Sequence, residues 1–134
     1  MVRILDFGGR EADRTVTVAS LRALKNSGTR LVQVTAGTAE EAAAAEAADI
    51  DMVACLANAV PEVRAGSSRV FVSAAIDFDG AVTEDDLLAA AFNALNAGAD
   101  AVITARAMSC VRRLTAEDLP VIGHLGFVPK KSTL

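Results

Sequence analysis

Short apolar runs alternate along this chain with segments in which apolar residues recur at helical spacing. Several runs are rich in β-branched residues and nearly continuous, a pattern typical of strands buried on both faces of a parallel sheet. Strands that alternate with helices predict an α/β fold in which right-handed crossovers join the parallel strands. The predicted strands are residues 31–35, 50–56, 69–76, 101–104 and 120–123.

Capping residues predict where the first two helices begin. Ser20 precedes the apolar segment 21–25 and Gly28 follows it, which predicts a short helix with a serine N-cap and a glycine after its last turn. Thr38 and Glu41 have the spacing of a capping box, so we expect an alanine-rich helix from there to about residue 48.

The longest helix is predicted after Thr83. Acidic residues fill its first turn, apolar residues follow helical spacing, and Gly98 comes after its end. Residues 57–68 contain Pro61 and a Gly-Ser-Ser turn, so a helix there must be short. Another short helix is expected over residues 108–114.

Two helix-to-strand junctions resemble each other. Asp51 and Asp100 stand at the same offset between a helix end and a strand, as if one unit were used twice. Five strand–helix units fit a five-stranded doubly wound parallel sheet, or the first part of an eight-unit (β/α)₈ TIM barrel. A length of 134 residues by itself favours the doubly wound sheet.

Composition limits the class of protein. A chain that is 52% hydrophobic can bury a core, and we expect one α/β domain over residues 1–134, with 1–19 as an N-terminal segment and 20–134 as the repeats. Aromatic residues make up 4%, without Trp or Tyr, and the net charge is −4. Both argue against nucleic acid as a partner.

The expected compartment is the cytoplasm. Cys55 and Cys110 lie in apolar runs without CxxC or histidine spacing, which favours buried, inert thiols over a metal site or a disulfide. A charged residue interrupts the first apolar run, unlike a signal peptide, and no window is apolar enough to span a membrane.

Three segments resemble the ketopantoate hydroxymethyltransferase family. They are Ser-Leu-Arg-Ala-Leu-Lys at 20–25, Asn-Ala-Gly-Ala-Asp-Ala-Val at 96–102, and the Gly-His-Leu-Gly-x-x-Pro words within 120–129. The resemblance implies a partial (β/α)₈ barrel of about five units. It also implies transfer of a hydroxymethyl group from methylenetetrahydrofolate to a branched 2-oxo acid with magnesium, a step of pantothenate biosynthesis. A partial barrel leaves open strand edges, so we expect a homo-oligomer.

The metal site that the resemblance implies is degenerate in this chain. Ala57, Ala75 and Ala105 stand where the family carries acids, whereas magnesium usually needs one or two carboxylates. Asp77 lies just beyond the predicted third strand, followed by Asp79, and Asp77 is the remaining candidate metal ligand.

His124 is the one site residue that matches the family outright. As the only histidine, at the end of the fifth strand, it is the candidate catalytic residue, for proton transfer or for a hydrogen bond to the 2-oxo acid. Asn58 and Arg106 are candidate substrate-binding residues, the first through its amide and the second through a bidentate pair with an anion.

Other functions stay open. The missing acids fit a catalytically silent barrel relative that serves as a binding or assembly subunit, and a different 2-oxo acid carbon–carbon lyase is a further alternative. A phosphorylated receiver domain would need an acidic pair after the first strand. Thr35 is instead followed by Ala-Gly-Thr, which argues against that class.

Overall fold

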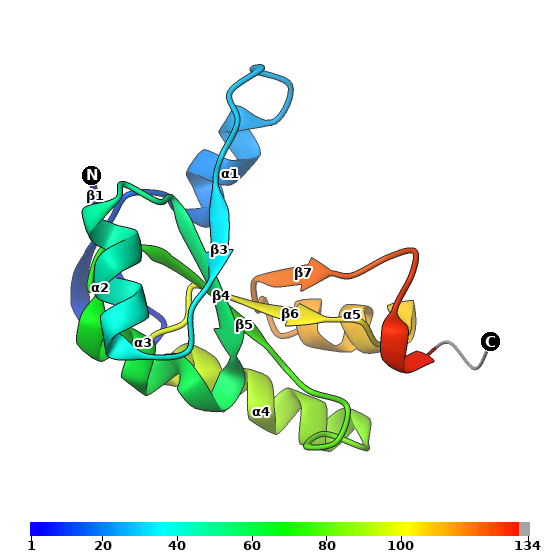
Figure 1. The fold of residues 1–134 in the computed structure, drawn as a ribbon. Coiled ribbons are helices and arrows are strands. Elements are labelled where there is room, and N and C mark those ends of the chain that lie inside the picture. Colours follow the sequence, from blue (N-terminus) through cyan, green and yellow to red (C-terminus); the bar gives the residue numbers. More distant parts are fainter. Residues whose placement is uncertain (132–134) are drawn as a thin grey trace.

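The computed structural model describes residues 1–131 and contains a five-stranded parallel sheet flanked by helices (Figure 1). This confirms the predicted α/β class. The strands lie side by side in the order in which they occur along the chain. They are β3 (Gln33–Thr35), β4 (Met52–Leu56), β5 (Phe71–Ala75), β6 (Ala101–Thr104) and β7 (Val121–Gly123), and four of them begin one or two residues later than predicted.

Four helices pack on one face of this sheet. Side chains alternate between the faces of a strand, and Val53, Val72 and Val102 share one face and one buried cluster with residues of all four helices. The helices are α2 (Ala39–Ala47), α3 (Val60–Gly66) after a short 3-10 turn (Ala57–Ala59), α4 (Glu84–Asn96) and α5 (Met108–Thr115).

The opposite face, here called the open face, is covered only near the amino ends of the strands. Phe71 and Ala101 are buried there against Val16 and Leu21, which belong to the chain just before α1 and to α1 (Val18–Leu24). Toward the carboxyl ends this face is open, and Leu56 is 53% exposed. The prediction of a sheet buried on both faces is therefore wrong for the carboxyl half, because the crossover helices all pack on the other side.

The N-terminal segment contains a β-hairpin that the sequence pattern did not predict. β1 (Val2–Leu5) and β2 (Glu11–Arg14) pair antiparallel. The turn between them includes Gly9 at φ +77°, in the left-handed region that favours glycine.

The boundaries of α1 differ from the prediction. Thr17, not Ser20, is the N-cap, and Ser20 at the third helical position returns the hydrogen bond to Thr17. The helix ends before Asn26, which has a φ of +68°, so Gly28 belongs to the turn that follows.

The predicted capping box of Thr38 and Glu41 is confirmed, and Gly98 follows α4 at φ +113° as expected. The structure adds a second capping box at the start of α4, formed by Thr83 and Asp86. Among residues 1–131 no helix is both long and apolar enough to cross a membrane.

Candidate functional site

The four predicted site residues all lie at the carboxyl edge of the sheet, on loops that follow successive strands. Asn58 follows β4, Asp77 follows β5, Arg106 follows β6 and His124 follows β7. The structure divides them between two cavities. His124 and Arg106 line one of about 420 Å³, and Asn58 and Asp77 line another of about 280 Å³.

His124 is held by the last rung of the sheet. Its backbone N–H donates to the carbonyl oxygen of Thr104 at 2.9 Å, so the β6–β7 ladder extends to this residue. The residue is exposed, and it shares the cavity with the loop that begins α5. Its backbone is therefore fixed, whereas its imidazole remains accessible to a ligand.

Arg106 fixes two loops to each other. Its guanidinium donates to the carbonyl oxygens of Ala81 at 2.5 Å and Val82 at 3.0 Å, and its backbone N–H donates to Thr104 Oγ1 at 3.1 Å. Carbonyl oxygens are neutral, and no carboxylate among residues 1–131 pairs with Arg106. The wall of the His124 cavity thus carries an uncompensated positive charge.

Asp77 is paired with a lysine of the C-terminal segment. Lys130 Nζ donates to Asp77 Oδ1 at 2.7 Å and to Asp79 Oδ2 at 3.3 Å. The hydrogen bond from Lys130 lowers the pKa of the Asp77 carboxyl, and the same bond raises the pKa of Lys130.

Residues 125–131, here called the strap, connect the two cavities. The strap leaves β7, turns back past the end of β6 and reaches the β5–α4 loop through Lys130 (Figure 1). Lys131 Nζ lies 5.7 Å from the centre of the Phe78 ring, and Lys131 also lines the His124 cavity.

The donors at this edge do not fit magnesium. Ala57, Ala75 and Ala105 offer no side-chain oxygen, and Asp77 is paired with Lys130. Within residues 1–131 no three His, Cys, Asp or Glu side chains gather closely enough to hold a metal ion.

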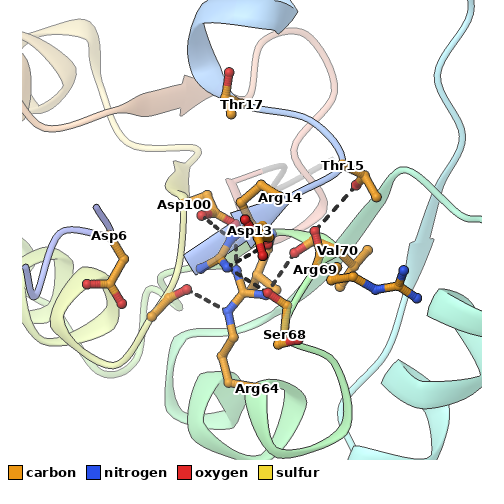
Figure 2. Close-up of polar contacts among 12 residues, drawn as sticks. Asp6, Asp13, Arg14, Thr15, Thr17, Arg64, Ser68, Arg69, Val70 and Asp100 are labelled. Carbon is orange, nitrogen blue, oxygen red and sulfur yellow. Dashed lines mark hydrogen bonds and ion pairs between the residues drawn. The ribbon is translucent and has the colours of Figure 1, made fainter. Parts of the chain in front are cut away.

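A second polar cluster lies at the amino edge, and Figure 2 shows two guanidinium groups that converge on Asp100. Arg14 Nε lies 2.8 Å from Asp100 Oδ1, and an Arg64 terminal nitrogen lies 2.5 Å from Oδ2. The carboxylate also accepts from the backbone N–H of Val72 at 2.8 Å. Only 7% of the Asp100 side chain is exposed, against 3% for Arg14 and 13% for Arg64.

The arginines of this cluster also donate to backbone carbonyls. Arg14 reaches Ser68, and Arg64 reaches Gly98 and Val70, at 2.6–2.7 Å. Burial lowers the pKa of Arg64, although Asp100 opposes this effect. With its donors directed at the protein itself, the cluster is a structural tie between the hairpin, α3 and the sheet.

No protein-family model matches the chain, and no curated protein matches it significantly.

Proposed function

We propose that this chain binds a small 2-oxo acid in the His124 cavity, at the carboxyl edge of a partial (β/α)₈ barrel. The observation that carries the proposal is that one cavity is lined by the exposed imidazole of His124 and by Arg106, whose charge no carboxylate compensates. A 2-oxo acid is an anion with a carbonyl beside its carboxylate, and both groups accept hydrogen bonds.

Strand order supports the partial barrel. The sheet runs β3-β4-β5-β6-β7, and the four crossover helices share one face. A doubly wound sheet reverses its strand order at a switch point, with helices on both faces, whereas a barrel keeps the sequential order with its helices outside. Barrel active sites lie at the carboxyl ends of the strands, where His124 is found.

Each residue of the cavity has a distinct part in the proposed binding. Arg106 is fixed by two carbonyls, so it attracts the carboxylate through its charge rather than through a new bidentate pair. His124 donates a hydrogen bond from its accessible imidazole to the carboxylate or to the 2-oxo group. Lys131 adds a second positive charge to the wall.

The resemblance to the ketopantoate hydroxymethyltransferase family implies hydroxymethyl transfer as the reaction at this site. In the family, a metal favours loss of the proton next to the 2-oxo group, and the resulting enolate attacks methylenetetrahydrofolate. Since the donors here do not fit magnesium, the residues support binding of the 2-oxo acid more directly than transfer. A catalytically silent relative that retains the substrate site is the alternative consistent with this loss.

Calorimetric titration with 3-methyl-2-oxobutanoate tests the proposal. We expect saturable binding that His124→Ala weakens by about 10- to 150-fold, the range for a hydrogen bond to a charged group. Arg112→Ala, at an exposed position of α5 outside the cavity, should leave the affinity unchanged. A branched ketone without the carboxylate is the control ligand.

Two results would decide against this function. Absence of saturable binding, or equal affinity of wild type and His124→Ala, removes the 2-oxo acid site. An assay with methylenetetrahydrofolate, with and without Mg²⁺, distinguishes an active transferase from a catalytically silent relative. Turnover that needs Mg²⁺ would show that the protein binds the metal and is not catalytically silent.

One contact favours a phosphoacceptor of the receiver type as a second candidate. Lys130 reaches Asp77 at 2.7 Å, and a receiver likewise places a lysine near an aspartate at the end of its third strand. Against this, the first strand of the sheet is not followed by the acidic pair that a receiver needs, and the sheet lacks the strand reversal of that fold. Incubation with acetyl phosphate and intact-mass measurement tests it, with Asp77→Asn as control.

A further inference from the structure

We propose that the open strand edges of the sheet form an interface between two copies of this chain. A two-fold axis parallel to the strands would place β7 of each copy beside β3 of the other, so that two five-stranded sheets enclose their open faces in one ring of ten strands. This inference does not rest on 2-oxo acid binding.

The backbone at both edges has hydrogen-bonding groups that point away from the sheet. In β7, the carbonyl of Pro120 and the N–H of His124 bond to β6, so the alternate residues Val121 and Gly123 face outward. In β3 the groups that bond to β4 belong to residues 32 and 36, which leaves Gln33 and Thr35 facing outward. Both edges run in the same direction, as a parallel β7–β3 pair requires.

The open face has apolar surface that one copy leaves uncovered. A cavity of about 560 Å³ lies on it between α1 and β7, lined by side chains that include Leu21, Phe71 and Ile122. Side chains fill the interior of a closed barrel. In Figure 1 the side of the sheet between α1 and β7 carries none of the helices α2 to α5.

The charges near the two strand edges favour a second copy of this chain as the partner that pairs with them. The loop before β3 carries Lys25 and Arg30, and the loop before β7 carries Glu117 and Asp118. The proposed symmetry brings the basic loop of one copy beside the acidic loop of the other at both β7–β3 junctions. Within residues 1–131, Lys25, Arg30 and Asp118 have no ion-pair partner in their own copy.

Removing the outward N–H of Gly123 tests the proposed β7–β3 junction directly. We expect a dimer by sedimentation velocity and by light scattering. Gly123→Pro removes the outward N–H without touching the bonds to β6, and should raise the dimer dissociation constant at least tenfold. Gly123→Ala is the matched control, because a Cβ there would meet only Met108 Cε, at 3.9 Å.

A charge reversal provides a second variant that leaves the strands intact. Arg30→Glu should weaken the dimer several-fold at low salt, and adding Asp118→Asn should recover part of the loss. Arg3→Glu makes the same charge change in the hairpin and should have no effect. If Gly123→Pro fails to fold by circular dichroism, the Arg30 and Arg3 variants decide.

Three outcomes would overturn the interface. One is a monomer with cooperative unfolding at all concentrations. Another is a dimer that neither Gly123→Pro nor Arg30→Glu weakens. A third is a monomer that binds a separately expressed downstream segment of a longer polypeptide, since that segment would then occupy the edges.

Discussion

Asp100 shows how one carboxylate organises the amino edge of the sheet. Asp51 is the residue at the matching position of the other helix-to-strand junction. Its Oδ2 accepts a hydrogen bond from Val32 N–H, just as Asp100 accepts one from Val72 N–H. Each aspartate thus fixes the start of the preceding strand. Asp100 also accepts hydrogen bonds from two largely buried arginines, and the one from Arg14 of β2 attaches the hairpin to the sheet.

Asp100→Asn should destabilise the protein by about 3–5 kcal/mol, because it leaves two largely buried guanidinium groups without their carboxylate. Urea unfolding followed by circular dichroism measures the loss. Asp51→Asn is the control and should cost no more than about 1.5 kcal/mol, since it weakens a single hydrogen bond. Equal losses in the two variants would show that the arginines do not depend on Asp100.

Lys130→Met should raise the pKa of Asp77 toward its ordinary value, because the hydrogen bond from Lys130 is the main cause that lowers it. The lowered pKa means that this contact stabilises the strap above the ordinary carboxyl pKa of 3.8, and that the stabilisation is lost as the pH falls through the lowered value. Carboxyl carbon shifts followed by NMR across this range measure both effects.

Asp86 is the internal reference for that titration. The backbone N–H of Thr83 lowers its pKa independently of the strap, so Lys130→Met should leave it unchanged. A pKa of Asp77 that stays low in the variant would mean that Lys130 does not hold it in solution.

At the scale of elements, the close approach of α2 and α3 depends on Gly66. A Cβ at this position would overlap the backbone carbonyl of Ala39, so α3 can end against the start of α2 only because residue 66 has no side chain. The small residues Ala42 and Ala45 of α2 are buried in the same cluster as Val63 of α3. The alanine-rich composition of α2 therefore serves close packing as well as helix propensity.

Gly66→Ala should destabilise the protein by about 1–3 kcal/mol, because the backbone of one helix must move to admit the methyl group. Thermal and urea unfolding measure the change. Gly80→Ala is the matched control: no atom lies within 4 Å of its added Cβ and its φ is not positive, so the change should stay within about 0.5 kcal/mol. Equal stability of the two variants would contradict the close packing.

At the scale of the whole molecule, the sheet has one face inside a core and one face partly in solvent. Core side chains from α2, α3, α4 and α5 meet the sheet on one side, whereas α1 covers only the amino half of the other. The free edges β3 and β7 bound the open side. A molecule of this form has its stable centre in β4, β5 and β6 and its exposed groups at the two edges.

Hydrogen exchange should report this gradient. The amides of Val72 and Val102, bonded at 2.8 and 3.0 Å, should exchange only through global unfolding. The outward amides of Gln33 and Gly123 should exchange fast in dilute protein and more slowly as the concentration rises and two copies pair. Fast exchange of the edge amides at every concentration would contradict edge pairing, and fast exchange of Val72 would contradict the assigned core.

The sequence by itself determined the features that depend on near neighbours. The alternation of strands and helices, the cap at Thr38 and the glycine after α4 at Gly98 follow from residues a few positions apart. It failed at Ser20, because Thr17 and Ser20 both carry hydroxyls and each can cap the other. It also placed the candidate site residues at strand ends, since the carboxyl ends of parallel strands meet at one edge.

Only the tertiary structure decided which distant groups meet. Lys130 and Asp77 are 53 positions apart, and Arg14 and Asp100 are 86 apart, so no local pattern could pair them. The separation of His124 and Arg106 from Asn58 and Asp77 depends on how the strap turns back across the edge. The exposure of the open face could not be predicted either. An apolar strand pattern indicates that a strand can be buried, but not on which side of the sheet the helices pack.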